Sequence, residues 1–351
     1  MRELAVPLRL LRLVSASYGL VVRVRTWLYA TGWFPTWRLP CRVISVGNLT
    51  VGGTGKTPVV IWLVQALLRR GLRVGVLSRG YKRKSEAEFL LVSDGKAVLA
   101  GPAEAGDEPH LIASRCPGAV VAVGADRYGT GRWVLNRFPL DCVVLDDGFQ
   151  HLALHRDVNL LLVDASAPGD LGALLPAGRL REPLTAAARA TLVLLTRVDQ
   201  ACQHEGRTDL VGALRRTDHP VLVRFTPETF VDVASGAEQA LDGVAGRTAM
   251  LFSGIGNSGA FRTTMDELSV TVVDEVRFPD HHAYRDSDLK LLRERSRACG
   301  AQLLVTTEKD AVKVAPLLRN GDQVLALRLG TEILDGRERV EQAVFGEKNV
   351  A

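Results

Sequence analysis

The sequence has few cysteines, and their spacing matches no common metal or disulfide pattern. No two of them form a Cys-x-x-Cys pair, and their number is odd. We therefore interpret them as reduced thiols in a cytosolic compartment and expect no zinc site. The five cysteines are Cys41, Cys116, Cys142, Cys202 and Cys299.

The chain also lacks an apolar run that is long enough to cross a bilayer. Residues 1–38 are rich in Leu, Val, Trp and Tyr, but arginines interrupt them, and the uncharged stretch 13–22 falls short of the about 20 residues that a spanning helix needs. The same arginines argue against a secretory signal peptide. Internal repeats and low-complexity tracts are absent as well. The overall composition, 47% hydrophobic and 24% charged, is that of a globular protein.

The basic, apolar character of residues 1–38 leaves two interpretations open. Arginines beside interfacial aromatic residues are typical of a helix that lies on an anionic membrane. A helix that packs on the folded domain and keeps its arginines in water would have the same composition. The net charge of +5 favours an anionic partner of some kind, such as a nucleotide, a phospholipid, a phosphorylated substrate or a nucleic acid.

A glycine-rich stretch, VISVGNLTVGGTGKT, organises the remaining chain. An apolar run at 43–46 predicts a strand, and residues 58–70 predict an amphipathic helix. Strand, glycine-rich loop and helix together predict a phosphate-binding loop, although Thr50 occupies the position where the strict pattern has glycine. In such a loop the backbone N–H groups bind phosphate, the lysine reaches the terminal phosphates and the threonine hydroxyl binds Mg²⁺. The predicted nucleotide-binding residues are Gly52, Gly53, Thr54, Gly55, Lys56 and Thr57.

Short apolar runs alternate with helical patterns along the chain, as in a doubly wound, mostly parallel α/β sheet. A polar, poorly periodic stretch at 226–247 separates two groups of such runs. We therefore predict a P-loop domain at 39–225, a linker at 226–247 and a smaller α/β lobe at 248–351. The predicted strands lie at 43–46, 73–77, 120–123, 142–145, 160–163, 192–195, 221–225, 249–252, 270–273, 302–306 and 324–327.

Two adjacent carboxylates, Asp146 and Asp147, directly follow a predicted buried strand. A P-loop protein holds its Mg²⁺ shell at such a strand end, so Asp146, Asp147 and Thr57 are the candidate metal residues. Two carboxylates at a solvated strand end would be the structural alternative. The neighbouring candidates for binding transferred phosphate are Arg127, which could instead pair with Asp126, and Arg181.

Asp107 and the histidine pair of the second lobe carry the remaining chemistry. Asp107 stands at a predicted helix start, where an acidic residue can be a simple cap or a general base. His281 and His282 follow Asp280, and they could bind a metal or pair with a carboxylate. With the predicted boundary at 226–247, Asp107 and His281 belong to different lobes and could meet only across a cleft.

The order of the motifs is more specific than any one of them. From the N-terminal segment to about Lys313, the chain resembles the tetraacyldisaccharide 4'-kinase family, the lipid A kinases of outer-membrane biogenesis. The motifs that carry the resemblance are NLTVGGTGKTP, SRGY, GDEP, GADR, DDGFQH, PAGRLRE, FPDHH and TTEKD.

This resemblance implies a reaction and a set of roles. The γ-phosphate of ATP would pass, with Mg²⁺, to the 4'-hydroxyl of a tetraacylated glucosamine disaccharide 1-phosphate. The fold would be two α/β lobes joined by a β linker, and the enzyme would be peripheral on the cytoplasmic face of the inner membrane. By motif, Asp107 matches the catalytic aspartate, His281 the histidine that assists it, and Lys56, Arg127 and Arg181 other catalytic groups.

Two other functions are alternatives to this kinase. A P-loop GTPase or metallochaperone-type ATPase switch is the main alternative. Residues 196–199 (TRVD) only loosely match a guanine-reading motif, because threonine and arginine replace its asparagine and lysine. A nucleic-acid-dependent ATPase is disfavoured, because the arginines gather in the apolar N-terminal segment and no aromatic-lined basic groove is evident, so we expect no nucleic-acid partner.

Overall fold

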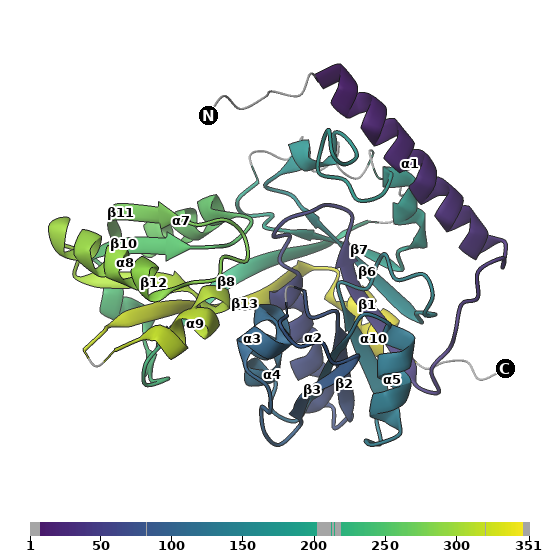
Figure 1. Ribbon diagram of the computed structural model, residues 1–351, viewed down its shortest axis with the longest axis horizontal. Helices are drawn as coiled ribbons and strands as arrows, with labels where there is room; N and C mark the ends of the chain where they lie inside the picture. Colours follow the sequence, from purple (N-terminus) through teal and green to yellow (C-terminus); the bar gives the residue numbers. More distant parts are fainter. Residues whose placement is uncertain are drawn as a thin grey trace. The chain divides into compact units, whose positions relative to one another are not determined.

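The computed structural model describes residues 8–81, 83–201, 212, 214, 219–319 and 321–346 (Figure 1). Cys202, one of the predicted free thiols, lies outside these residues. The chain forms two compact units. Unit 1 comprises Met1–Arg79, Asp126–Arg224 and Glu332–Ala351, and unit 2 comprises Gly80–Ala125 and Phe225–Thr331.

Unit 1 is built on a parallel sheet. Its strands lie in the order β8-β7-β6-β1-β5-β2, and β1, which precedes the glycine-rich loop, has β6 on one side and β5 on the other. Helix α2 packs on β1, β2 and β5 with its apolar face. The elements that lie wholly in unit 1 are α1 (Leu8–Ala30), β1 (Arg42–Asn48), α2 (Lys56–Arg69), β2 (Val74–Ser78), α5 (Arg127–Leu135), β5 (Cys142–Asp146), β6 (Val158–Asp164), β7 (Leu192–Thr196) and α10 (Arg337–Phe345).

The parallel pairing decides where the polar ends of these strands lie. β1 and β5 pair in register, with Val46 opposite Asp146. Because parallel strands point the same way, the loop after β1 and the Asp146–Asp147 pair leave the same edge of the sheet. This is the edge at which open α/β sheets bind ligands.

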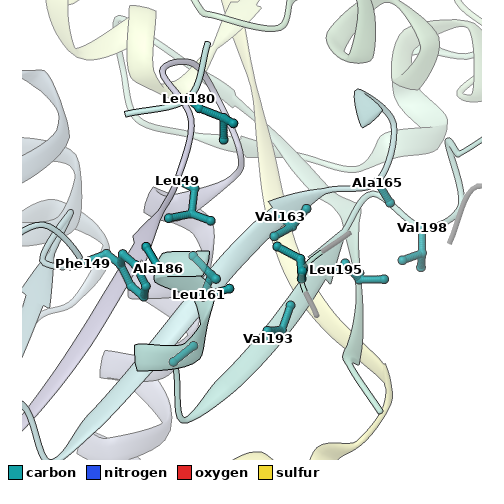
Figure 2. Close-up of a cluster of buried hydrophobic side chains, with 13 residues drawn as sticks. Leu49, Phe149, Leu161, Val163, Ala165, Leu180, Ala186, Val193, Leu195 and Val198 are labelled. Atoms are coloured by element: carbon teal, nitrogen blue, oxygen red, sulfur yellow. The ribbon is translucent and has the colours of Figure 1, made fainter. Parts of the chain in front are cut away.

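An apolar cluster holds three loops of unit 1 in place. Figure 2 shows Leu49, Phe149 and Leu180 packed with side chains of β6 and β7. Leu49 follows β1, Phe149 belongs to the DDGFQH motif and Leu180 to the PAGRLRE motif, and none of the three exceeds 4% exposure. The same core that stabilises the sheet therefore fixes the loops at its edge.

Helix α1 packs on unit 1 with a narrow face and exposes its apolar side chains. The Ser15 hydroxyl donates to the Leu174 carbonyl (3.0 Å), and the Tyr18 hydroxyl donates to the Arg181 carbonyl (2.8 Å). Leu13, Leu20 and Trp27 are 57% exposed or more. Among the helices of the described residues, none is both long and apolar enough to span a bilayer.

Unit 2 combines two stretches of chain that are distant in sequence. One contributes an antiparallel pair, β3 and β4, and the other a parallel sheet in the order β11-β10-β12-β13. The elements that lie wholly in unit 2 are β3 (Phe89–Asp94), α3 (Pro102–Ala105), α4 (Asp107–Arg115), β4 (Val120–Gly124), β9 (Glu238–Gln239), β10 (Thr248–Ser253), α7 (Ser258–Glu267), β11 (Thr271–Arg277), α8 (Asp286–Ala298), β12 (Leu303–Thr307) and α9 (Glu308–Val314).

Two long strands, β8 (Val221–Asp232) and β13 (Val324–Asp335), run from one unit into the other. The predicted mixed, mostly parallel α/β fold is confirmed, and each predicted strand range overlaps an observed strand. The sequence underestimated the length of β8 and β13, because their C-terminal halves are mostly half-exposed or exposed and contain many polar residues, so they resemble a polar linker.

The predicted domain boundary differs from the units observed. We expected residues 39–225 to form one domain, but the contacts place Gly80–Ala125 in unit 2. Helix α4 packs against α9, and Arg115 on α4 bonds Glu308 on α9 (Nη1 to Oε2, 2.5 Å) and Glu228 on β8 (Nη2 to Oε2, 3.1 Å). The periodicity of a single stretch cannot reveal such a long-range association.

Candidate active site

The glycine-rich loop is fixed by polar contacts along its length. Gly52 and Gly55 have φ angles of 119° and 84°, which only glycine adopts without strain, and Gly55 is the N-cap of α2. The Asn48 side chain donates to the Thr54 hydroxyl (2.9 Å), and the Thr196 hydroxyl donates to the Thr54 carbonyl (3.0 Å). The loop therefore ends with Lys56 as the first residue of a helix, where N–H groups attract anions.

Thr50 can stand where the strict motif has its first glycine, because the backbone is extended there and does not require glycine. It forms an antiparallel bridge with Leu180 of the PAGRLRE loop. The Val51 N–H donates to the Arg179 carbonyl (2.8 Å), and the Arg181 N–H donates to the Leu49 carbonyl (2.7 Å). The PAGRLRE loop thus forms a second support for the phosphate-binding loop, which the sequence did not reveal.

Asp147 lies at the centre of a cluster of charges in unit 1. Its carboxylate lies 2.8 Å from Arg181 Nη1 and 3.6 Å from Lys56 Nζ. Burial alone would raise the pKa of Asp147, but the charges of Lys56, Arg181 and Arg127 outweigh it and lower the pKa to about 2. We call Lys56, Arg127, Asp146, Asp147 and Arg181 the Asp147 cluster.

The other acidic residue, Asp146, is 1% exposed and accepts a hydrogen bond from the Ser78 hydroxyl (2.8 Å). Arg127 is 5% exposed, and burial lowers its pKa while the charges of Asp146 and Asp147 act in the opposite direction. The neighbouring Asp126 is the N-cap of α5 and accepts from two backbone N–H groups. The electrostatic partners that matter for Arg127 are therefore the two aspartates.

The Asp147 cluster fits a bound Mg²⁺. Asp147 Oδ1 is buried and has no hydrogen-bond partner among the described residues, and Thr57 is half-buried in the first turn of α2. Mg²⁺ in phosphate-transferring sites is held by one or two carboxylates together with substrate phosphates. No group of three or more His, Cys, Asp and Glu side chains with metal-binding geometry occurs in the described part of the chain, so nucleotide phosphates would have to complete the coordination.

In unit 2, Asp107 and His281 form a close pair. Asp107 is the first residue of α4 and is 7% exposed, and His281 Nδ1 lies 3.1 and 3.2 Å from its two carboxylate oxygens. The other histidine, His282, instead contacts Asp288 (Nε2 to Oδ2, 3.0 Å) and stacks on Phe278. Asp107 therefore pairs with His281 rather than His282.

The backbone around His281 is held in an uncommon conformation. His281 has a φ angle of 58°, and its N–H donates to the Gly254 carbonyl (3.1 Å). The Gly254 N–H in turn donates to Asp310 Oδ2 (2.9 Å), and Asp310 is fully buried. A strained residue that its surroundings hold in place in this way is typical of a functional site.

Two lysines of α9 complete this cluster, which we call the Asp107 cluster: Asp107, Glu108, Asp280, His281, Lys309 and Lys313. Lys309 Nζ lies 3.2 Å from His281 Nε2, and Lys313 Nζ lies 3.7 Å from Asp107 Oδ2. Burial would raise the pKa of Asp107, but the hydrogen bond from His281 and the nearby positive charges lower it to about 2. Asp107 is therefore a carboxylate at neutral pH.

The structure corrects our expectation about the position of this pair. Asp107 and His281 belong to the same unit, so they do not meet across a cleft between lobes. The sequence motifs did not reveal Ser78, Lys309 and Lys313 as partners of the site residues. A signal was present for two of them, because Ser78 opens the SRGY motif and Lys309 belongs to TTEKD, which follows a strand.

Comparison with known proteins agrees with the motifs and the geometry. The sequence model of the tetraacyldisaccharide-1-P 4'-kinase (LpxK) family matches residues 7–346. The chain belongs to this family. A tetraacyldisaccharide 4'-kinase from Geobacter metallireducens is 42% identical over 93% of this chain and 95% of its own length, and one from Desulfatibacillum aliphaticivorans is 40% identical over 92% and 88%.

A solved structure of another member has the same fold. The crystal structure of LpxK from Aquifex aeolicus in complex with ATP superposes with a TM-score of 0.75 and is 33% identical, covering 97% of this chain and 99% of that one. These matches confirm the predicted family, fold and enzyme class, a tetraacyldisaccharide 4'-kinase, and the Aquifex protein binds ATP, one of the two cofactors that we predict.

Proposed function

We propose that this member of the family transfers the γ-phosphate of ATP to the 4'-hydroxyl of a tetraacylated glucosamine disaccharide 1-phosphate, at the cytoplasmic surface of the inner membrane. The observation that carries this proposal is the Asp107–His281 pair. In a nucleotide switch the attacking group is water, and no second substrate has to be oriented. A kinase needs a carboxylate to orient the attacking hydroxyl and accept its proton.

The Asp147 cluster supplies the groups that bind phosphate. Lys56, the first residue of α2, would reach the β- and γ-phosphates of ATP, and the N–H groups of residues 52–57 would bind them. Arg127 and Arg181 neutralise charge on the phosphoryl group as it is transferred. Bound Mg²⁺, held by Thr57 and one or both of Asp146 and Asp147, would neutralise the phosphate oxygens.

The Asp107 cluster supplies the group that receives the proton. Because Asp107 is ionised at neutral pH, it can accept a hydrogen bond from the acceptor hydroxyl. His281 holds one side of this carboxylate, and it thereby orients the remaining lone pairs. A loose phosphoryl-transfer transition state makes little demand on base strength, so a weakly basic carboxylate contributes through its orientation and its negative charge.

Helix α1 provides the membrane contact in this proposal. Its exposed side chains include Leu13, Leu20 and Trp27, and Arg12 and Arg23 of the same helix are exposed as well. An apolar surface beside arginines binds anionic bilayers by burial of the apolar groups and by charge attraction. The packed face, with Ser15 and Tyr18, would keep the helix attached to unit 1.

The reaction is tested directly by mass analysis. The full chain is incubated with ATP, Mg²⁺ and the lipid disaccharide 1-phosphate in detergent, and we expect a product heavier by one phosphoryl group, with the phosphate on the 4'-oxygen. Preference for GTP, together with hydrolysis that is independent of the acceptor, would support the nucleotide switch and contradict the kinase.

The membrane contact is tested separately with vesicles that contain anionic phospholipid. We expect the triple variant Leu13→Ser, Leu20→Ser and Trp27→Ser to sediment less with these vesicles than the wild type, and added salt to weaken the wild-type binding. Leu334→Ser is the matched control, because Leu334 is a 46% exposed residue of unit 1 outside α1. Equal sedimentation of all three proteins would make α1 a packing helix only.

A further inference from the structure

Lys309 is the charged residue of the TTEKD motif whose role remains to be assigned. It is the second residue of α9, and its side chain is 17% exposed. Its Nζ lies 2.9 Å from Glu108 Oε1, 3.4 Å from Asp280 Oδ1 and 3.2 Å from His281 Nε2. A lysine with three polar neighbours so close to the Asp107–His281 pair is placed to act on that pair.

The donor and acceptor chemistry leaves one arrangement of protons. A lysine ammonium only donates hydrogen bonds, so His281 Nε2 must accept, and a neutral imidazole then carries its proton on Nδ1. An ionised carboxylate only accepts, so Asp107 accepts from that Nδ1–H. The opposite tautomer would place an N–H against the ammonium and a lone pair against the carboxylate. A doubly protonated ring would place a second cation 3.2 Å from Lys309.

We propose that Lys309 is a positioning residue that holds His281 as a neutral Nδ1–H donor to Asp107. Among the described residues, the groups facing His281 are Asp107 and Lys309 at hydrogen-bond distance, Asp280 (Oδ2 3.9 Å from Nε2) and the Tyr81 ring (centroids 5.1 Å apart). Lys309 is the only one of these groups with a positive charge. A neutral donor leaves the full negative charge on Asp107, which can then accept the proton of the acceptor hydroxyl. This catalytic consequence rests on the proposed function.

The surroundings keep Lys309 charged and in place. Burial would lower its pKa, but the carboxylates of Glu108, Asp107 and Asp280 outweigh this and raise it. The start of α9 is fixed by Glu308, which bonds Arg115 (2.5 Å) and Arg328 (Oε1 to Nε, 2.9 Å). Lys309 therefore has little freedom to leave His281.

Nitrogen NMR of the imidazole rings tests this assignment without any turnover. In the full chain labelled with ¹⁵N-histidine, the His281 signals are identified by their loss in His281→Gln. At neutral pH we expect Nδ1 of the wild type to carry a proton and Nε2 to carry none. In Lys309→Met we expect both nitrogens to become protonated, because Asp107 remains and the competing cation is gone.

Two further variants separate the effect of the hydrogen bond from Lys309 from the effect of a nearby positive charge alone. Lys309→Arg keeps a donor and a positive charge, so His281 should stay in the wild-type form. Lys313→Met removes a lysine that lies 3.7 Å from Asp107 but has no contact with His281 Nε2, so it should also leave the ring unchanged. A wild-type ring protonated on Nε2, or an unchanged ring in Lys309→Met, would overturn the proposal.

Kinetics then connects the tautomer to the reaction. We expect Lys309→Met to lose at least about tenfold in kcat with the KM for ATP unchanged, the scale of losing one charge-assisted hydrogen bond. The loss should grow as the pH is lowered from 8 to 6, and Lys309→Arg should recover part of it. If the wild type does not phosphorylate the lipid, the kinase proposal fails while the NMR result still decides the role of Lys309. A wild-type kcat in Lys309→Met, despite a changed ring, would remove Lys309 from the catalytic role.

Discussion

The Asp147 cluster and the Asp107 cluster each hold a carboxylate whose pKa is about 2, but different neighbours lower the two values. In both clusters, burial is the largest single effect, and it raises the pKa of the carboxylate. For Asp147 the opposing effect begins with the charge of Lys56, whereas for Asp107 it begins with the hydrogen bond from His281. Permanent cations balance the first carboxylate, and a donor whose own protonation can change balances the second.

This difference suits the two roles that we propose. A site that binds ATP and a metal ion needs charges that do not vary with pH, and lysine and arginine provide them. A site that orients a hydroxyl needs a carboxylate with a defined direction, and a histidine donor provides that direction. We expect the Asp147 cluster to tolerate changes of pH better than the Asp107 cluster does.

The largest effect should come from the Asp107 cluster. Asp107→Ala should lower turnover by roughly a thousandfold, within the range of losing a positioned acid–base group, while ATP binding persists. If Asp107 and His281 act as one unit, the double variant with His281→Ala should be little worse than the worse single variant. The measurement is a double-mutant cycle on kcat at saturating ATP.

His282→Ala is the matched control for this cycle, because His282 is the adjacent histidine and contacts Asp288 rather than Asp107. Its loss of turnover should be much smaller than that of His281→Ala in proteins shown to be folded. Fully additive losses, or a small effect of Asp107→Ala, would return Asp107 to a structural role in the first turn of α4.

The next largest effect should come from the Asp147 cluster. Lys56→Ala removes one of the cations around Asp147 and the proposed phosphate contact, so we expect turnover to fall by roughly a hundredfold, the scale of one preorganised electrostatic group. The loss should be similar from pH 6 to pH 8, in contrast to that of Lys309→Met. The exposed Lys290→Ala serves as control. Near-normal turnover of a folded Lys56→Ala protein would exclude the P-loop lysine from the mechanism.

The smallest effect concerns stability in acid. The pKa of Asp107 in the folded protein is about 2, below the ordinary value of 3.8. Ionised Asp107 therefore stabilises the fold at every pH above about 3.8. This contribution is lost as the pH falls from 3.8 toward 2. The contribution at neutral pH is about 2 kcal/mol. Asp107→Asn should therefore lower the free energy of unfolding at pH 7, and the gap to the wild type should narrow below pH 4.

Urea unfolding followed by circular dichroism at pH 7 and at steps down to pH 3 measures this gap. Asp286→Asn is a surface control, because its carboxylate is 67% exposed and forms an exposed pair with Arg319. A gap that stays constant from pH 7 to pH 3 would mean that the hydrogen bond from His281 does not stabilise the ionised form of Asp107.

Much of the Asp147 cluster could be predicted because its residues follow strands that the sequence marks clearly. Val43 to Val46 and Cys142 to Leu145 are buried, apolar runs, and parallel strands bring the loops after them to one edge. The support from Arg181 was less visible, because its loop has no regular periodicity. Its backbone N–H donates to the Leu49 carbonyl and its side-chain Nε donates to the Thr50 carbonyl, and neither acceptor is a side chain that a motif would mark.

The sequence by itself determined the local features: the strands of the parallel sheet, the glycine turns before α2, the acidic pair after β5 and the family to which these motifs belong. Only the tertiary structure decided that Gly80–Ala125 associates with Phe225–Thr331, and so that Asp107, His281 and Lys309 meet. Periodicity records which face of an element is buried, but not which distant element covers it. Asp107 and His281 are 174 positions apart. Helix α4, which carries Asp107, packs against α9, which carries Lys309, and His281 contacts both of these residues.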